Sequence, residues 1–213
     1  MFRDRFDAGK QLAAALSGYR GRKNDTVVLA IPRGALQIGQ VLHEELDLPL
    51  DVIITKKIPH PANDEFAIGA VGPGGEYFVN DLASVEVPLP YIERKVKEIA
   101  SAIDSRYKKY RAGAPPAKLE GKTVIVVDDG IATGSTMIAA MHFLRKQNPA
   151  KVVIAVPVAP PDVAERMRQE ADEVVCLDTP ELFFAIGQFY DSFPQVEDEE
   201  AIAILKKCRK DQG

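Results

Sequence analysis

Residues 123–137 read TVIVVDDGIATGSTM, and no other stretch of the chain says as much about its architecture. Five residues suited to a buried strand, Thr123 to Val127, precede two carboxylates, a loop of small residues and an apolar segment with helical spacing. Such apolar runs are typical of strands that are buried on both faces of a parallel sheet. We therefore predict an α/β fold in which this strand ends at the ligand-binding edge of the sheet.

The loop after this strand offers hydrogen-bond donors with little bulk. Residues 133–136 lead into the predicted helix, and a loop in this position points its backbone N–H groups at whatever sits there. Such a turn suits a phosphate group. Asp128 and Asp129 cannot also bind phosphate, because like charges repel; they are better suited to sugar hydroxyls, or to water around a metal ion. Together, the two elements predict a site for a ribose 5-phosphate.

This arrangement resembles the phosphoribosyl pyrophosphate (PRPP) motif of the type I phosphoribosyltransferases. In that family, four apolar residues, two acidic residues and a loop ending in Thr-Gly-x-Thr follow one another in this order. The resemblance implies that the acidic residues contact the ribose hydroxyls of PRPP and that the loop binds its 5-phosphate. The alternative is an ordinary strand–loop–helix turn of another α/β protein. In this stretch, the residues expected to bind PRPP are Asp128, Asp129, Gly130, Ile131, Ala132, Thr133, Gly134, Ser135 and Thr136.

Arg33 and Gly34 lie between a predicted strand, residues 26–31, and a predicted helix, residues 35–46. An arginine can clamp diphosphate oxygens with two hydrogen bonds, and a glycine permits close backbone approach. In the resembled family, the loop after this strand binds pyrophosphate, often around a cis peptide bond before a glycine. We therefore expect a cis bond at Arg33–Gly34 or at Pro32–Arg33. The alternative is a helix start with an exposed arginine.

Lys56 and Lys57 end the next predicted strand, residues 51–58. Because adjacent strand residues face opposite sides, we expect only one of the two to point at the ligand. A lysine there would neutralise the charge that develops on departing pyrophosphate, and the resembled family carries a basic residue in this region. The alternative is a solvated strand end. We thus expect a catalytic role for Asp128, Asp129, Arg33 and Lys56, and PRPP contacts from Arg33, Gly34, Lys56 and Lys57 as well.

Residues 59–80 occupy the place of the mobile lid in the resembled family. A glycine-rich cluster, residues 72–75, separates two short apolar stretches and predicts a hairpin. A lid excludes water from a reactive sugar cation, which fits transfer chemistry. Several relatives place a lid lysine or arginine on the diphosphate, but between Lys57 and Arg94 the only possible cation here is His60. This difference favours an alternative function, a regulatory protein that binds PRPP or a nucleotide and has little transferase activity.

Strands and helices alternate along most of the chain, which predicts a twisted, mainly parallel sheet with helices on both faces. We expect one domain, residues 1–213, with the lid hairpin and a small hood formed by residues 1–20 and 180–213. The other predicted helices are residues 7–17, a long helix from Pro88 or Pro90 to Tyr110, 137–144, 160–171 and 198–207; the other predicted sheet strands are 151–158 and 173–177.

The resemblance implies a reaction at C1 of PRPP. Pyrophosphate would leave with its charge shielded by Mg²⁺, and a nitrogen nucleophile, usually a nucleobase, would attack C1 to form a nucleotide. The Mg²⁺ would be held by substrate oxygens and water, without a direct protein ligand. Ala132 stands where members that act on 6-oxopurines place an aspartate, so adenine, orotate, uracil, xanthine and other acceptors stay open. Phe184, Phe189 and Tyr190 are candidates to stack the base, although aromatic residues at this density are more often core.

The composition is that of an ordinary globular protein: 213 residues, 46% hydrophobic and 27% charged, with a net charge of −4. The charge predicts no nucleic-acid partner, and no apolar run approaches the roughly 18 residues needed to span a bilayer. The N-terminus lacks the apolar core of a signal peptide, and Cys176 and Cys208 are most simply reduced thiols. We therefore expect a cytoplasmic protein without a membrane partner. Relatives are commonly dimers, so a homodimer is one oligomeric state that the resemblance implies.

Overall fold

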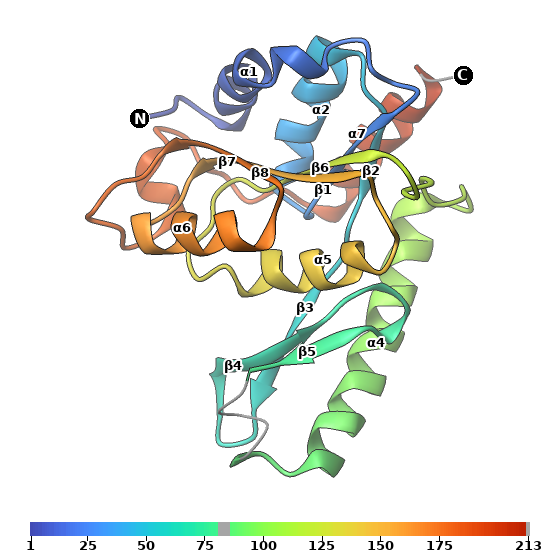
Figure 1. Cartoon of the computed structure of the whole chain (residues 1–213), viewed down its shortest axis with the longest axis vertical. Coiled ribbons are helices and arrows are strands. Elements are labelled where there is room, and N and C mark those ends of the chain that lie inside the picture. Colours follow the sequence, from blue (N-terminus) through green and yellow to red (C-terminus); the bar gives the residue numbers. More distant parts are fainter. Residues whose placement is uncertain (81–85, 212–213) are drawn as a thin grey trace.

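A five-stranded parallel sheet lies at the centre of the structure, a computed structural model that describes residues 1–80 and 86–211 (Figure 1). The strand order is β2-β1-β6-β7-β8, and every neighbouring pair runs parallel. This architecture confirms the predicted mainly parallel α/β fold. The strands are β1 (Thr26–Ala30), β2 (Leu50–Val52), β6 (Thr123–Val127), β7 (Lys151–Val158) and β8 (Glu173–Asp178).

Helices cover both faces of this sheet, as predicted from the alternating pattern (Figure 1). All five residues of β1 and of β6 are buried, because a strand covered on both sides needs apolar side chains on both. In the α2 helix, Ile38, Leu42 and Leu46 follow one another at intervals of four and are all buried against the sheet. One face carries α1 (Arg5–Ala15), α2 (Ala35–Leu46) and α7 (Asp198–Lys210); the other carries α5 (Ser135–Arg145) and α6 (Pro161–Glu170).

A second, antiparallel sheet extends away from the first along the α4 helix (Figure 1). The predicted hairpin around residues 72–75 is confirmed, since β4 and β5 pair antiparallel on either side of it. A third strand, β3, pairs with the other edge of β4. That residues 59–80 move as a lid stays a prediction. The elements are β3 (Lys56–His60), β4 (Asn63–Val71), the 3₁₀ turn η2 (Pro73–Gly75), β5 (Tyr77–Val79) and α4 (Leu89–Arg111).

The single strand predicted over residues 51–58 is wrong, because the chain passes here from one sheet to the other. The N–H of Ile53 still donates to the carbonyl oxygen of Ala30 at 3.0 Å. The next N–H, of Ile54, instead donates to the hydroxyl of Tyr107 on α4 at 2.8 Å. An unbroken apolar run does not reveal where the backbone exchanges one strand partner for another. Lys56 therefore begins the second sheet rather than ending a strand of the first.

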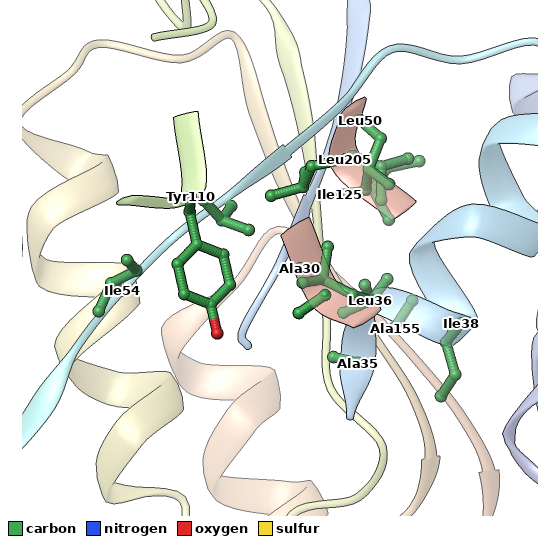
Figure 2. Close-up of a cluster of buried hydrophobic side chains, with 14 of the residues drawn as sticks. Ala30, Ala35, Leu36, Ile38, Leu50, Ile54, Tyr110, Ile125, Ala155 and Leu205 are labelled. Atoms are coloured by element: carbon green, nitrogen blue, oxygen red, sulfur yellow. The ribbon is translucent and has the colours of Figure 1, made fainter. Parts of the chain in front are cut away.

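One apolar cluster runs from the α1–α2 face of the parallel sheet to the second sheet. Figure 2 shows part of it, with Ile54 and Tyr110 at one end, Ile38 of α2 at the other, and Ile125 of β6 and Leu205 of α7 between them. That residues 1–213 form a single domain stays a prediction, and Gln212 and Gly213 of the predicted hood lie outside the described residues. Among the described helices, none is long and apolar enough to cross a membrane.

Candidate functional site

The two loops that the sequence predicted to bind PRPP lie side by side at a switch point of the parallel sheet. β1 has β2 on one side and β6 on the other, so the strand order reverses between β1 and β6. Ala30 pairs with Val127 in the last register position, and the N–H of Ile31 donates to the carbonyl oxygen of Val127 at 3.0 Å. The loops that leave two such strands part in opposite directions, which opens a crevice at the carboxyl ends. Residues 31–34 and 128–134 border it.

The acid pair, Asp128 and Asp129, begins directly after β6 and is held from three sides. The Asp128 carboxylate is half-buried, and its Oδ1 accepts the N–H of Asp129 at 2.8 Å. The Asp129 Oδ2 accepts a hydrogen bond from Nε of Arg5 at 2.7 Å, within an ion pair whose Arg5 side chain is 5% exposed. The Tyr190 hydroxyl donates to the Asp129 carbonyl oxygen at 2.6 Å. The N-terminal helix and the C-terminal tail thus both fix the pair.

The two carboxyl groups of the acid pair have different electrostatic surroundings. Burial, and next to it the charge of Asp129, raise the pKa of the Asp128 carboxyl well above its ordinary value. Arg5 opposes this rise in pKa but does not cancel it. Asp129 receives the guanidinium directly, whereas Asp128 faces a like charge and pairs with no cation among residues 1–80 and 86–211. A ligand that donates hydrogen bonds or brings a cation would therefore relieve the charge on Asp128 most.

The donor loop, residues 130–136, leads into α5 as predicted. Gly134 is the N-cap of α5 with a φ of +76°, and no side chain caps the helix, so its first N–H groups are open to a ligand. Thr133 is exposed, and its Oγ1 lies 3.3 Å from Oγ of Ser135. Thr136 is partly exposed in the first turn. Hydroxyls and amides at the positive end of the helix dipole form a surface that can accept an anion.

Gly130 and Ile131, the first two residues of the donor loop, lie in the core. The Ile131 side chain is 4% exposed, and its N–H donates to the carbonyl oxygen of Val158 at 2.9 Å. Gly130 is buried, and a Cβ at this position would lie 2.7 Å from Cγ2 of Ile186. Both residues anchor the loop to β7 and to the tail. Ala132, between them and Thr133, is exposed.

The loop after β1 approaches the acid pair closely. The Pro32–Arg33 peptide bond is cis, one of the two alternatives predicted from the sequence. Gly34 has an ordinary helical φ of −55°, so its conformation does not require glycine. The lack of space around Gly34 does require glycine, because a Cβ would lie 2.7 Å from Nε of Arg5 and would overlap the Asp129 carboxylate. The backbone of this loop therefore contacts the acid pair as only glycine allows.

The Arg33 side chain points toward the start of α7. Its Nη1 lies 3.3 Å from Oε2 of Glu197 and 3.9 Å from Oδ1 of Asp198, and the side chain is 30% exposed. Hydrogen bonds from Lys109 and then Tyr110 lower the pKa of the Asp198 carboxyl to about 2, so this partner stays ionised. The predicted clamp of Arg33 on diphosphate stays a prediction.

Lys56 and Lys57 are both exposed at the start of β3. Lys56 lines a cavity of about 120 Å³ together with Thr55 of the linking segment and Arg106 of α4. The Thr55 hydroxyl donates to the carbonyl oxygen of Thr136 at 3.1 Å, which joins this cavity to the start of α5. Lys57 does not line the cavity. Lys56, but not Lys57, thus lines this cavity near the start of α5, and a contact of either lysine with a ligand stays a prediction.

The three aromatic candidates for base stacking have different surroundings. Tyr190 is 6% exposed, and its ring packs between Phe2 at 5.4 Å and Phe193 at 4.8 Å, measured between centroids. Phe189 is partly buried against another ring of the same cluster. Phe184 is 87% exposed, on a loop that the Gln188 side chain braces by accepting the N–H of Phe184 at 2.8 Å. Of the three, Phe184 alone presents an open ring face.

Sequence reasoning missed Arg5, the only charged side chain on the buried side of α1. The predicted helix began at residue 7, two residues too late, and so left Arg5 outside it. In the observed helix, Arg5, Ala8, Gly9 and Leu12 lie on one buried stripe. A charged residue on an apolar stripe is the signal that could have identified it, because a buried charge needs a partner.

A separate cavity of about 740 Å³ lies between α4, α5 and residues 116–120. Its walls include Tyr107 and Phe143, and its lining contains neither member of the acid pair and no residue of the donor loop. The candidate site is therefore defined by the chemistry at the switch point and not by this larger hollow.

Comparisons with known proteins identify the family of this chain. Residues 3–193 match the family described as "Phosphoribosyl transferase domain". A Mycobacterium tuberculosis H37Rv protein named "Putative phosphoribosyl transferase Rv0571c" is 38% identical over 213 residues, which cover 99% of this chain. This chain covers 48% of that protein, so it spans about half the length of the curated relatives it matches.

Solved structures share the fold. The crystal structure of TT1426 from Thermus thermophilus is 40% identical, covers 97% of this chain and 98% of its own, and has a TM-score of 0.84. A purine phosphoribosyltransferase from Pyrococcus horikoshii is 18% identical over 89% of this chain and 93% of its own, with a TM-score of 0.50, which shows a common fold only. With the acid pair, the donor loop and the glycine-bearing loop at one switch point, and with most of its length matched, this chain belongs to the phosphoribosyl transferase domain family.

Proposed function

We propose that this protein is a Mg²⁺-dependent phosphoribosyltransferase, which transfers the 5-phosphoribosyl group of PRPP to a nitrogenous base and releases pyrophosphate. One observation carries the proposal: the acid pair, the donor loop and the loop around Gly34 meet at the crevice between β1 and β6. These three elements offer acceptors for hydroxyls, donors for a phosphate and a close backbone approach, which are the needs of a phosphorylated sugar with a second anionic group.

In this proposal, the residues position the substrate and stabilise charge, with no covalent role. Thr133, Ser135 and Thr136 hold the 5-phosphate with their hydroxyls and with the N-terminal amides of α5. Asp128 and Asp129 accept hydrogen bonds from the ribose hydroxyls. The Arg5 ion pair holds the Asp129 carboxylate in place. The carboxyl of Asp128 has no such ion pair, so ligand binding changes its electrostatic surroundings more.

The acid pair suits a Mg²⁺ ion that binds together with the substrate. Among the described residues, no group of three His, Cys, Asp or Glu side chains is arranged to hold a metal ion. Mg²⁺ binds proteins through one or two carboxylates, water and substrate phosphates. Bound PRPP oxygens and water would therefore hold it, with Asp128 and Asp129 facing it through water. When bound, the ion shields the charge of the departing pyrophosphate.

The acceptor is a nitrogenous base of open identity. Ala132 is exposed in the donor loop and carries no group that could handle a ring proton. The Phe184 ring is placed on a braced, exposed loop of the hood and is our candidate to stack the base. Phe189 and Tyr190 support that loop from the core. The proposal includes a cytoplasmic location, which suits the free thiols of Cys176 and Cys208.

The test combines binding and turnover. Isothermal titration with PRPP and Mg²⁺ measures affinity, and a pyrophosphate-release assay across a panel of purine and pyrimidine bases measures transfer. Asp128→Asn with Asp129→Asn removes the ribose acceptors and is expected to abolish PRPP binding while the fold persists by circular dichroism. A matched variant, Asp162→Asn with Glu165→Gln on the exposed side of α6, removes two charges elsewhere and should bind like the wild type. Unchanged PRPP affinity in the acid-pair variant would remove the ribose assignment.

A second candidate function is a regulatory protein that binds PRPP or a nucleotide with little turnover. The absence of lysine and arginine between Lys57 and Arg94 in the sequence favours it, because a lid cation helps to stabilise departing diphosphate. The same pair of assays separates the two candidates. Tight PRPP binding without pyrophosphate release for any base supports the regulatory protein. Release with one base supports the transferase and identifies its acceptor.

A further inference from the structure

Two arginines from distant parts of the chain meet at one carboxylate beside the candidate site. Oδ1 of Asp198 lies 3.9 Å from Nη1 of Arg33 and 3.4 Å from Nη2 of Arg106. Arg33 belongs to the loop after β1, Arg106 to α4, and Asp198 is the first residue of α7. A single anionic oxygen therefore already bridges both guanidinium groups.

Arg106 also lines a small cavity near the start of α5. With Thr55 and Lys56 it lines the cavity of about 120 Å³, and Thr55 is hydrogen-bonded to Thr136 in the first turn of α5. The Arg106 side chain is 39% exposed, so its guanidinium can reach a ligand in solution. Arg106 thus lies beside Arg33 at the Asp198 carboxylate and beside Lys56 in this cavity.

In the proposed PRPP site, the second anionic group of the substrate needs positive charge near it. The sequence between Lys57 and Arg94 contains no lysine or arginine, so within residues 59–80 only His60 could supply it. A guanidinium presents a planar fork of donors that matches the oxygens of a phosphate. The guanidinium groups of Arg33 and Arg106 lie close enough together to share one anionic oxygen. Two such groups suit a diphosphate better than a single phosphate.

We propose that Arg106 of α4 is a diphosphate-binding residue. Together with Arg33 and Lys56, it supplies the positive charge that a lysine or arginine of the lid would otherwise provide. The inference rests on the proposed PRPP site. In the free protein, the Asp198 carboxylate occupies the shared position between the two arginines. A diphosphate oxygen takes that position when substrate binds.

The experiment measures three ligands by isothermal titration: PRPP with Mg²⁺, pyrophosphate with Mg²⁺, and ribose 5-phosphate. Arg106→Gln is expected to weaken PRPP and pyrophosphate binding by about tenfold to a hundredfold, the loss of one charge-assisted hydrogen-bond donor group. Ribose 5-phosphate, which reaches only the acid pair and the donor loop, should bind unchanged. Arg106→Lys keeps the charge but loses the planar set of donors, so its affinities for PRPP and pyrophosphate should lie between those of Arg106→Gln and the wild type.

Lys109→Gln is the matched control, because Lys109 also pairs with Asp198 but does not line the cavity. It should leave all three affinities unchanged. The inference is overturned if Arg106→Gln binds PRPP and pyrophosphate as tightly as the wild type, or if Lys109→Gln weakens them equally, since α7 docking would then explain the effect. Failure of the proposed function gives a different result: the wild type would bind neither PRPP nor ribose 5-phosphate.

Discussion

Arg5, in the first turn of α1, donates from its Nε to the Oδ2 of Asp129 at 2.7 Å, across 124 residues of sequence. The same guanidinium donates from Nη1 to the carbonyl oxygen of Pro194 at 2.7 Å and lies 3.7 Å from the centroid of the Phe193 ring. One buried side chain therefore connects the N-terminal helix, the acid pair and the C-terminal tail. The geometry of the acid pair depends on this connection, because nothing in the local β6 sequence provides a cation.

Replacing Arg5 by methionine should destabilise the protein by about 3 kcal/mol, because a largely buried carboxylate of Asp129 loses its partner. Urea denaturation measures the change in the free energy of unfolding. Arg3→Met is the control: Arg3 is 76% exposed and pairs with Asp7 on the surface, so its loss should cost less than about 1 kcal/mol. Equal unfolding midpoints for Arg5→Met and the wild type would contradict the stabilising role of the ion pair.

Gly34→Ala should cost about 1–3 kcal/mol of stability and weaken PRPP binding, because the added Cβ overlaps the Asp129 carboxylate and crowds Arg5. Thermal unfolding and PRPP titration measure the two effects. Gly18→Ala serves as the control, since a Cβ there meets no atom within 4 Å and Gly18 has no positive φ. If Gly34→Ala behaves like Gly18→Ala in both measurements, the close approach does not constrain the site.

Asp128→Asn should stabilise the ligand-free protein increasingly as pH rises. Burial, and then the charge of Asp129, raise the pKa of Asp128 in the folded protein above its ordinary value of 3.8. The folded state therefore holds this proton more tightly than the unfolded chain, and wild-type stability falls as pH rises from 3.8 through the raised pKa. Asparagine has no charge to bury, so the variant lacks this loss.

Urea denaturation of both proteins at about pH 4, 6 and 8 gives the difference in the free energy of unfolding between Asp128→Asn and the wild type. The difference should be small at the lowest pH and grow toward the highest. A difference that stays constant over the whole range would show that the carboxyl of Asp128 is not perturbed by its burial.

Asp198→Asn should have the opposite pH dependence. Hydrogen bonds from Lys109 and then Tyr110 lower the pKa of Asp198 to about 2, so its stabilising effect is complete above 3.8 and is lost as pH falls toward 2. At neutral pH the variant should lose about 1 kcal/mol, since Asp198 and Lys109 are partly exposed and their attraction is screened by solvent. Denaturation curves should converge with those of the wild type as pH falls below about 4. A loss independent of pH would indicate a packing effect in place of an ionic one.

The strands and helices around the site could be predicted because their signals are local. The helix at residues 35–46 and the strand at 151–158 occur with the predicted bounds, since their apolar periods are continuous and their ends coincide with changes in composition. The exchange of sheets at residues 53–55 could not be predicted. The apolar run continues through it, and the acceptor of the Ile54 N–H is a hydroxyl on α4 that comes much later in the chain.

The chain by itself determined the acid pair and the donor loop, because contiguous residues at the end of a strand and the start of a helix carry that chemistry wherever the strand lies. Packing alone decided which arginines pair with the carboxylates around these elements. Arg5 reaches Asp129 and Arg106 reaches Asp198 over 124 and 92 residues. The physical reason is that a side chain's partner across such a separation is set by which helix faces bury their apolar stripes together, and no local pattern records that choice.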